Sequence, residues 1–229
     1  MFDDNGVILG DVIWASPTEL RMYYIGFQLV EKVKFLAFTG LAVSSDNGET
    51  FIRIQNTPVL DRAPQAPFIN ALHSIEKSGN GYRAWISCGQ RWQLIDGASY
   101  PQYNCWTLKS ADGITFEMRG ATKILDVIDT EYRIGRPRAY RVPGGYELRV
   151  TSDTLDKQYT CHLALSQDGI SFERTTTVEL PRGQAGDWDC EMTCYPARID
   201  TLQGESYLFY NGNGMGRTGV GVARWEETA

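Results

Sequence analysis

The chain has 229 residues, of which 28 are acidic and 22 basic, so its formal net charge at pH 7 is −6. This charge, with both signs interspersed, excludes the basic face that a nucleic-acid partner needs, and no apolar run is long enough for a membrane span. Five cysteines without a C-x-x-C pair and only two histidines do not predict a zinc site, and an odd number of cysteines without an apolar leader favours reduced thiols and a cytoplasmic location.

Four segments rich in aromatic and β-branched residues recur along the chain, and a loop or turn signal precedes each one. They begin at Arg21, Tyr82, Tyr146 and Tyr207, at intervals of 61, 64 and 61 residues. This composition is typical of β-strands, whereas helical periodicity is nearly absent. We interpret the four segments as the second strands of four similar repeats.

Three of the repeats also contain a short cassette in which Ser precedes an Asp-Gly or Asp-Asn-Gly turn and Phe follows it. Asp next to glycine is typical of a turn, because its carboxylate accepts bonds from nearby backbone N–H groups and glycine adopts positive φ freely. We therefore interpret each cassette as the hairpin between a third and a fourth strand, and its Asp as scaffold rather than as a ligand for substrate or metal. The cassettes span residues 44–51, 110–116 and 166–172, with Asp46, Asp112 and Asp168 at the turns.

The strands group into one domain of four repeats, at about residues 6–61, 62–125, 126–183 and 184–229. Such strand-turn-strand repeats predict the blades of a β-propeller. The expected fold is all-β, a five-bladed β-propeller type that is incomplete, with about four blades of four-stranded antiparallel sheet. The last repeat stops after its third strand, so a blade is expected before residue 2, unless the ring stays open or a partner covers the open blade edge in an oligomer.

Motifs at both ends of the chain and in its middle carry a family resemblance. They are Phe2-Asp-Asp-Asn-Gly6, Glu131-Tyr-Arg-Ile-Gly-Arg-Pro-Arg138, Gly186-Asp-Trp-Asp189 with Cys194-Tyr-Pro196, and the segment 209–219, together with the cassettes. With these motifs the chain resembles, over nearly its whole length, the five-bladed propeller superfamily of glycoside hydrolase families 32, 43, 62 and 68. It is most similar to uncharacterised relatives of these enzymes that are linked to bacterial surface-polysaccharide biosynthesis.

The resemblance implies glycosidic bond cleavage or transfer in a central funnel, where the inner first strands of the blades bring carboxylates together. One carboxylate must be a protonated acid and a second an ionised base or nucleophile. Asp3 and Asp4 stand where the family has its second-blade aspartate, and solvated carboxylates in an N-terminal turn are an equally supported interpretation. The first strand of the second repeat, residues 68–76, has no acid in the expected position, which argues against a standard hydrolase.

Two further carboxylates are catalytic candidates. Glu131 lies near Arg136 and Arg138 in the sequence, and a neighbouring arginine keeps a carboxylate ionised, which suits a base, a nucleophile or a substrate clamp; an ordinary loop ion pair is the alternative. Asp189 is the strongest single candidate because it flanks Trp188, whose ring is expected to stack on a sugar while carboxylates accept bonds from the sugar hydroxyls. A tryptophan packed between blades is the alternative for Trp188.

The substrate-binding candidates are polar or aromatic residues expected near the funnel, whereas His73 and His162 are interpreted as structural. No cofactor is expected, although a calcium or magnesium ion in the funnel stays compatible with the sequence because these ions need only oxygen ligands. The binding candidates are Arg91, Trp92, Arg136, Arg138, Asp187, Trp188, Tyr195, Asn211 and Asn213.

Three functions are compatible with these residues. The first is a carbohydrate-active enzyme, hydrolase or transferase, that uses Asp3 or Asp4, Glu131 and Asp189. The second is a non-catalytic glycan-binding or scaffold propeller in surface-polysaccharide biosynthesis, which the missing acid favours. In both, the partner is a carbohydrate or another sugar-containing small molecule. The third is a protein-interaction propeller, which predicts an apolar or charged patch on the rim.

Overall fold

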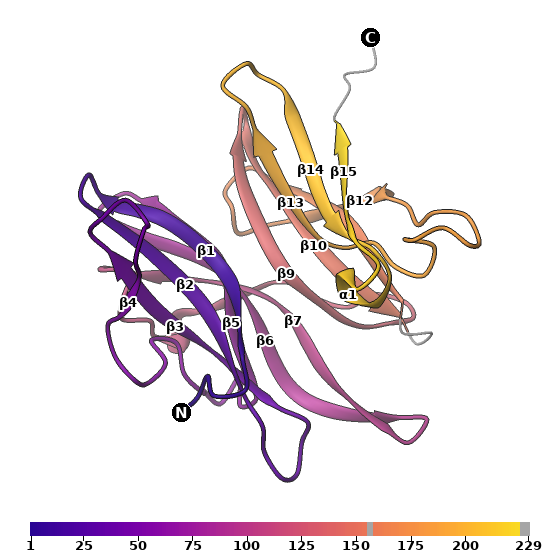
Figure 1. The fold of residues 1–229 in the computed structure, drawn as a ribbon, viewed down its shortest axis with the longest axis horizontal. Helices are drawn as coiled ribbons and strands as arrows, with labels where there is room; N and C mark the ends of the chain where they lie inside the picture. Colours follow the sequence, from indigo (N-terminus) through magenta and orange to yellow (C-terminus); the bar gives the residue numbers. More distant parts are fainter. Residues whose placement is uncertain (155–157, 225–229) are drawn as a thin grey trace. The chain divides into compact units, whose positions relative to one another are not determined.

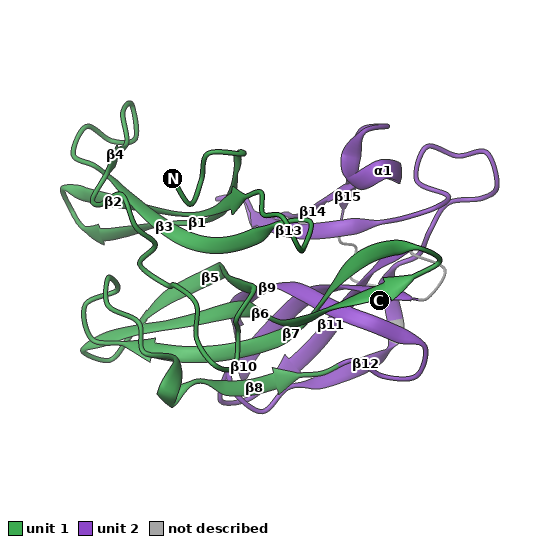
Figure 2. Cartoon of the chain, turned by 90° about the horizontal axis from the view of Figure 1, so that it is seen from below, with its two compact units in different colours: residues 1–126 green, residues 127–229 purple. Residues whose placement is uncertain are grey.

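The chain folds into two compact units built from β-strands. The computed structural model describes residues 1–154 and 158–224 (Figure 1). Residues 1–126 form unit 1 and residues 127–229 form unit 2, which Figure 2 colours green and purple. In the described part of the chain, no helix is both long and apolar enough to cross a membrane.

Unit 1 contains one eight-stranded sheet whose two halves are antiparallel meanders of four strands each. The halves are joined by two parallel residue pairs between β3 and β5, Ala37 with Ile69 and Phe38 with Asn70. A 3-10 turn, η1 (Met118–Gly120), precedes the last strand. The first half has the strands β1 (Val7–Ser16), β2 (Glu19–Gln28), β3 (Leu36–Ser44) and β4 (Ile52–Arg53), and the second has β5 (Ile69–Ser78), β6 (Gly81–Ile95), β7 (Ala98–Ser110) and β8 (Thr122–Leu125).

Unit 2 contains a four-stranded and a three-stranded antiparallel sheet. Within each of these two sheets, every strand pairs with its neighbour in the sequence, as in a meander. A single helical turn, α1 (Asn213–Gly216), lies between the last two strands. The first sheet has the strands β9 (Glu131–Val142), β10 (Gly145–Thr154), β11 (Tyr159–Ser166) and β12 (Glu173–Leu180), and the second has β13 (Cys194–Asp200), β14 (Ser206–Asn211) and β15 (Val220–Arg224).

The predicted strand order agrees with the structure. We call the strand groups β1–β4, β5–β8, β9–β12 and β13–β15 blades 1 to 4. The predicted second strands are β2, β6, β10 and β14, and each pairs with a first strand on one side and a third strand on the other. The cassettes connect the third to the fourth strand in blades 1 to 3. The all-β prediction is therefore confirmed, whereas the assignment of the whole chain to one domain stays a prediction.

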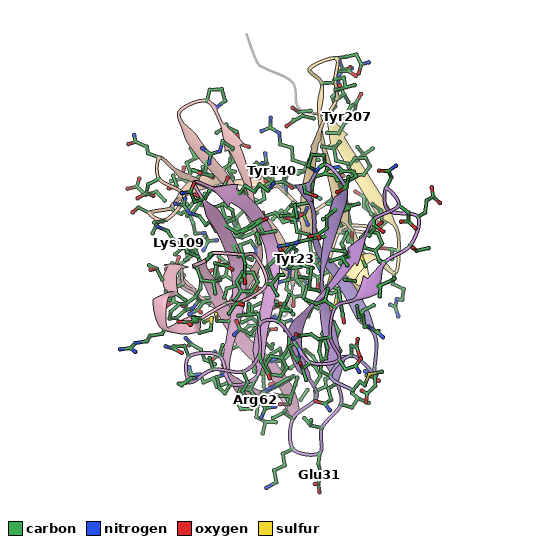
Figure 3. The ribbon with its side chains drawn as sticks, turned by 90° about the vertical axis from the view of Figure 1, so that its left-hand side faces the viewer. Tyr23, Glu31, Arg62, Lys109, Tyr140 and Tyr207 are labelled. Carbon is green, nitrogen blue, oxygen red and sulfur yellow. The ribbon has the colours of Figure 1, made fainter. Side chains whose placement is uncertain are left out.

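The core of unit 1 lies between blades 1 and 2. Side chains alternate along each strand, so that every second residue points toward the neighbouring blade. Tyr23 and Leu41 from blade 1 pack there with Leu72 and Ile86 from blade 2, and all four are at most 2% exposed. Figure 3 shows Tyr23 in the interior, whereas the charged Glu31 lies at the periphery. Each large apolar side chain buried in this way stabilises the unit by roughly 2 kcal/mol.

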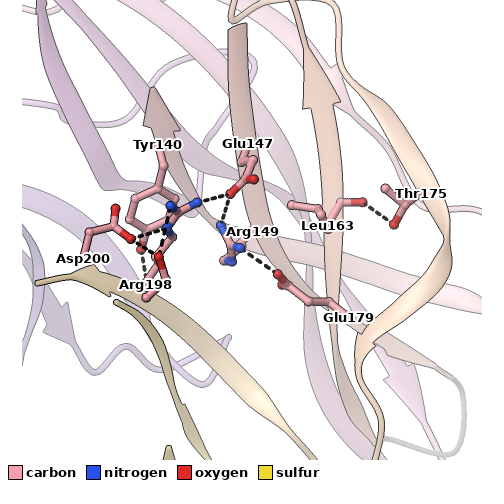
Figure 4. Close-up of polar contacts among 9 residues, drawn as sticks. Tyr140, Glu147, Arg149, Leu163, Thr175, Glu179, Arg198 and Asp200 are labelled. Atoms are coloured by element: carbon pink, nitrogen blue, oxygen red, sulfur yellow. Dashed lines mark hydrogen bonds and ion pairs between the residues drawn. The ribbon is translucent and has the colours of Figure 1, made fainter. Parts of the chain in front are cut away.

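A network of ion pairs connects the two blades of unit 2 (Figure 4). Arg149 on β10 is 2% exposed and bonds Glu147 at 2.7 Å and Glu179 on β12 at 2.8 Å. Arg198 on β13 bonds the same Glu147 at 2.8 Å and Asp200 at 2.7 Å. Burial raises the pKa of Glu179, although the charge of Arg149 opposes this. Removing one partner would leave a buried charge without its counterion, so the network constrains how blades 3 and 4 pack.

The cassettes are turns in which the Asp carboxylate accepts hydrogen bonds from backbone N–H groups of the same turn. In the second cassette, Oδ1 of Asp112 accepts bonds from the backbone N–H groups of Ile114 at 2.8 Å and Thr115 at 2.7 Å. Ser110 donates to the same oxygen at 3.0 Å and accepts the N–H of Gly113 at 2.9 Å. The backbone bonds lower the pKa of Asp112 to about 2. The third cassette repeats these bonds at Asp168, and in the first cassette Oδ1 of Asp46 accepts the backbone N–H of Thr50 and the Ser44 hydroxyl, as the scaffold interpretation predicts.

The first strand of every blade contains one extra residue at an equivalent position. The strand register skips Gly10 in β1 and His73 in β5. In β9, Arg136 and the next residue lie opposite the single residue Val150, and in β13, Tyr195 and the next residue lie opposite Tyr210. These positions are 63, 63 and 59 residues apart, close to the interval of the repeats. A β-bulge bends its strand and turns a side chain out of the regular alternation. Each blade therefore has an irregular side-chain position at this place on its first strand.

Gly10 shows how closely the first strands of unit 1 approach each other. A Cβ atom at this position would lie 2.9 Å from the carbonyl oxygen of Tyr23 and closer still to the carbonyl oxygen of Leu72. The next residue, Asp11, accepts a bond from the backbone N–H of Ile75 on β5 at 2.8 Å. Because carbonyl oxygens belong to the backbone, they cannot turn aside as a flexible side chain would.

Replacing Asp112 by alanine is expected to lower the free energy of unfolding by about 1 kcal/mol at pH 7, the usual effect of losing a side-chain oxygen that caps backbone N–H groups. The pKa is lowered from 3.8 to about 2 in the folded state, so this contribution is complete above pH 3.8 and is lost as the pH falls through 2. Denaturant unfolding of wild type and Asp112→Ala at several pH values between 2 and 7 measures this contribution of Asp112 to the free energy of unfolding. Asp112→Asn, which keeps an acceptor oxygen but does not titrate, is the control, and a pH-independent difference between wild type and Asp112→Ala would contradict the assignment.

Gly10→Ala is expected to destabilise the protein by roughly 2 kcal/mol, because the added methyl group forces β1 away from β5. Gly120→Ala is the matched control, since no atom lies within 4 Å of a Cβ atom built there. The midpoint of denaturant unfolding compares the two variants. Equal midpoints for both variants would show that β1 and β5 are further apart than described.

Candidate functional site

Asp3 and Asp4 lie in different environments at the start of unit 1. Asp3 is buried, and its Oδ2 accepts bonds from Arg53 Nη2 at 2.8 Å and from the hydroxyl of Tyr24 at 3.2 Å. Asp4 is exposed and pairs with the terminal ammonium group of Met1 at 3.1 Å. Asp4 thus fits the interpretation as a solvated turn residue, whereas Asp3 is a buried carboxylate whose charge Arg53 compensates.

Glu131 forms a two-point ion pair, but with a different arginine from those predicted. Its oxygens accept bonds from Nη1 and Nη2 of Arg174 on β12, both at 2.8 Å, and Oε2 also accepts the backbone N–H of Ile128 at 3.1 Å. The prediction named Arg136 and Arg138, which are closer in the sequence. Burial alone would raise the pKa of Glu131, but the hydrogen bonds and charge of Arg174 outweigh it and lower the pKa. The geometry fits the alternative interpretation of Glu131 as a structural ion pair.

Trp188 packs on Tyr210, Gly212 and Gly221 of blade 4, and we call this support the Trp188 seat. Its ring is tilted by 30° against that of Tyr210 on β14, with 5.4 Å between the centroids. Cβ atoms built on Gly212 and on Gly221 of β15 would come closer than 3.0 Å to the indole, so glycine is required at both positions. The residue is still 38% exposed. Trp188 is therefore supported on one side by blade 4 and accessible to solvent.

Asp189 bonds the residue beneath Trp188. The hydroxyl of Tyr210 donates to Asp189 Oδ2 at 2.9 Å, and Asp189 is 9% exposed. Burial, and after it the bond to Asp189, raises the pKa of Tyr210 to about 12. Among the four predicted catalytic carboxylates, Asp189 is the one whose bond in the described structure is to a neutral hydroxyl rather than to a cation. Tyr210 was not among the predicted residues, although it lies inside the segment 209–219.

Asn213 fixes the loop that carries Trp188. Its Oδ1 accepts the backbone N–H groups of Glu191 at 2.7 Å and Met192 at 3.0 Å. Its own backbone N–H donates to the carbonyl oxygen of Trp188 at 3.1 Å, and the hydroxyl of Thr218 donates to the same oxygen at 2.7 Å. Asn213, predicted to bind substrate, therefore positions Trp188.

The side chains of Asp187 and Asn211 each form a hydrogen bond with a nearby backbone group. Asp187 Oδ2 accepts the backbone N–H of Gln184 at 2.7 Å, and Nδ2 of Asn211 donates to the carbonyl oxygen of Met215 at 3.1 Å. Asp187 is exposed, and Asn211 is half-buried. Both side chains shape the loops around Trp188, and their contact with a substrate stays a prediction.

Arg91 and Trp92, both predicted to bind substrate, lie in a strand. Both belong to β6, which continues into a hairpin with β7. Trp92 packs edge-on against Phe35, with 5.0 Å between ring centroids, and Arg91 Nε donates to Oε1 of Gln102. The ring of Trp92 thus contributes to the packing of the hairpin.

A sequence signal for this hairpin was present. The two strands turn at Asp96 and Gly97, both with positive φ, 49° and 76°. Asp-Gly with two left-handed residues is a favoured two-residue hairpin turn. Beside the hairpin, residues 29–34 and 98–100 line an open hollow of about 530 Å³, and none of the predicted site residues lines it.

Arg136 and Tyr195, predicted separately as substrate-binding residues, meet in unit 2. The guanidinium carbon of Arg136 lies 4.3 Å from the centroid of the Tyr195 ring, and both residues are half-buried. Tyr159 packs against the same tyrosine, with 5.9 Å between centroids. Arg138 follows on β9, where it pairs in register with Arg149. The structure thus brings together residues 59 positions apart in the sequence.

Comparison with known proteins gives sequence relatives of no stated function. No family model matches the chain. "Uncharacterized protein Rv1502" of Mycobacterium tuberculosis strain H37Rv is 29% identical over 223 residues, which cover 97% of this chain and 72% of the relative. An equally similar relative, "Uncharacterized protein MT1551", comes from strain CDC 1551 of the same organism.

Comparison with solved structures shows the fold. A structure of a BT0996 RGII complex matches with a TM-score of 0.73 and 17% identity, over 98% of this protein and 71% of the other. A thermostable family-43 glycoside hydrolase matches with a TM-score of 0.69 and 13% identity, over 94% and 71%. The family-32 β-fructofuranosidase BmSUC1 of Bombyx mori matches with a TM-score of 0.60 and 15% identity, over 90% and 41%. The chain therefore has the fold of the propeller-type glycoside hydrolases, as the fold prediction stated.

Glu131→Gln is expected to destabilise the protein by roughly 3 kcal/mol, because Arg174 keeps its charge in a buried place without a counterion. The stabilising effect of Glu131 is complete above pH 4.5, its ordinary pKa, and is lost as the pH falls through the lowered folded-state value. Unfolding in urea at pH 7 measures the difference, and Glu173→Gln on the exposed face of the same strand as Arg174 is the control. Equal stability of Glu131→Gln and Glu173→Gln would contradict the structural role.

Proposed function

We propose that this protein binds a glycan and that Trp188 is the surface on which a sugar ring stacks. The observation that carries the proposal is the seat of Trp188, where the indole lies on Tyr210 and two glycines while 38% of the residue stays exposed. Contact with the apolar C–H face of a sugar removes this ring from water. Asn213 holds the loop in place beforehand, which reduces the entropy lost on binding.

Binding without hydrolysis is supported better than hydrolysis. A glycosidase needs a protonated acid opposite an ionised carboxylate. Asp3 and Glu131 are paired with arginines, and Asp4 is exposed to solvent. Asp189 bonds a neutral hydroxyl, so hydrolysis led by Asp189 is the second candidate function.

The structural neighbours support a carbohydrate as the ligand class. One was solved in an RGII complex, and a variant of the Bombyx mori β-fructofuranosidase was solved with sucrose. A role in surface-polysaccharide biosynthesis, a bacterial source and a cytoplasmic location belong to the same proposal. They rest on the sequence motifs and on cysteine usage.

Trp188→Ala is expected to weaken glycan binding about tenfold, the usual effect of removing a central aromatic contact. Isothermal titration with a panel of neutral oligosaccharides measures the affinity. Trp14→Ala is the matched control, because Trp14 is also exposed, at 49%, but lies on β1 of unit 1. If both variants bind as wild type does, Trp188 is not the sugar surface.

Asp189→Asn separates binding from hydrolysis. We expect this variant and the wild type to bind within a factor of about three of each other and neither to release reducing ends, because binding uses the ring above Asp189 rather than its charge. A reducing-sugar assay on the same oligosaccharides provides the measurement. Turnover by the wild type that Asp189→Asn abolishes, with affinity retained, would establish the hydrolase instead.

A further inference from the structure

Two bulky residues hold strained backbone conformations inside strands of unit 2. Arg136 on β9 has φ 53° and Tyr195 on β13 has φ 60°. In this left-handed region a side chain with a Cβ atom is unfavourable, and glycine is the residue that avoids the cost. Strain of this kind is characteristic of functional sites. Both residues occupy the bulge position of their blade, where blade 1 has Gly10.

The two strained residues are in contact through their side chains. The guanidinium of Arg136 lies over the Tyr195 ring at 4.3 Å, within the range of a cation–π interaction. A guanidinium presents its N–H donors in its own plane and can bind a carboxylate with two parallel bonds. The left-handed backbone therefore serves to place a rigid, positively charged donor group on an aromatic face.

Tyr195 lies in the same sheet as Tyr210, which supports Trp188, whereas Arg136 reaches Tyr195 from β9 of the other sheet of unit 2. The register of β13 and β14 pairs Cys194 with Asn211 and Ala197 with Phe209, so that Tyr210 stands opposite the bulge that contains Tyr195. Tyr210 in turn supports Trp188. Neighbouring strands of a sheet are about 4.8 Å apart, and this is comparable with the size of one sugar ring.

We propose that Arg136, stacked on Tyr195, binds the carboxylate of an acidic sugar, so that the glycan ligand contains uronic acid. This rests on the proposed glycan binding at Trp188. Trp188 contacts the apolar face of one ring, and Arg136 binds the carboxylate of the same or the adjoining sugar. Sugars without a carboxylate stack on Trp188 and make no ion pair with Arg136.

The experiment compares uronic-acid tetrasaccharides with their methyl esters, which have nearly the same shape but no charge. The probes are tetrasaccharides of galacturonic, glucuronic and mannuronic acid, each in both forms, titrated into the full chain. Arg136→Met and Arg136→Gly are expected to lose at least about tenfold in affinity for the preferred acid and to bind its ester as wild type does. Wild-type affinity for the acid falls with added salt, whereas that of Arg136→Met does not.

Arg141→Met is the matched control. Arg141 lies on the same strand and also stacks on a tyrosine, Tyr146 at 4.9 Å, but it is outside the bulge. Its removal is expected to change neither affinity. Arg136→Gly adopts the left-handed backbone without a Cβ atom, so thermal unfolding of this variant shows whether a loss of binding is a loss of fold.

Two outcomes distinguish the failure of this inference from failure of the proposed function. If neutral oligosaccharides bind through Trp188 and no acid binds more tightly than its ester, Arg136 does not select a carboxylate, and glycan binding stands. If no probe of either charge binds the wild type, glycan binding fails and the carboxylate site fails with it. Equal losses in Arg136→Met and Arg141→Met would show a general effect of charge and overturn the site.

Discussion

The first strand of each blade has to accommodate an extra residue at an equivalent position against its partner strand, and the described geometry of each unit follows from how it does so. In blade 1 the extra residue is Gly10, which lets β1 approach the carbonyl oxygen of Leu72 on β5. In blades 3 and 4 it falls at Arg136 and Tyr195, whose left-handed backbone turns their side chains out of the regular alternation. The same irregularity therefore gives close packing in unit 1 and a stacked pair of polar side chains in unit 2.

Arginine is the residue that makes buried carboxylates tolerable in this protein. Arg53 compensates Asp3, Arg174 compensates Glu131, and Arg149 lies between two glutamates of blade 3. Such pairs give a defined packing because Asp3, Glu131 and Glu179 would each be a buried charge without the arginine. They also keep these carboxylates ionised, so none of them is suited to the protonated acid that a glycosidase requires.

The sequence could predict those parts of the candidate site whose residues are close together in the chain. The sequence marks Trp188 between two carboxylates, and this pattern predicts a sugar surface there. The partner of Glu131 was not predictable, because Arg174 is 43 residues away, whereas the arginines suggested by proximity in sequence are within seven. Tyr210, the support of Trp188, was missed for the same reason, since it lies on β14, 21 residues from its partner Asp189 in the preceding loop, and only the fold brings the two together.

The sequence alone determined the number and order of the strands and the turn in each cassette. These depend on short-range chemistry, namely alternation along a strand and the ability of Asp, Ser and Gly to satisfy nearby backbone groups. Only the tertiary structure decided where each first strand bulges, which arginine meets which carboxylate, and that Arg136 stacks on Tyr195. Those features depend on contacts of a few ångströms between segments that lie far apart in the chain, and such distances are set when the sheets pack together.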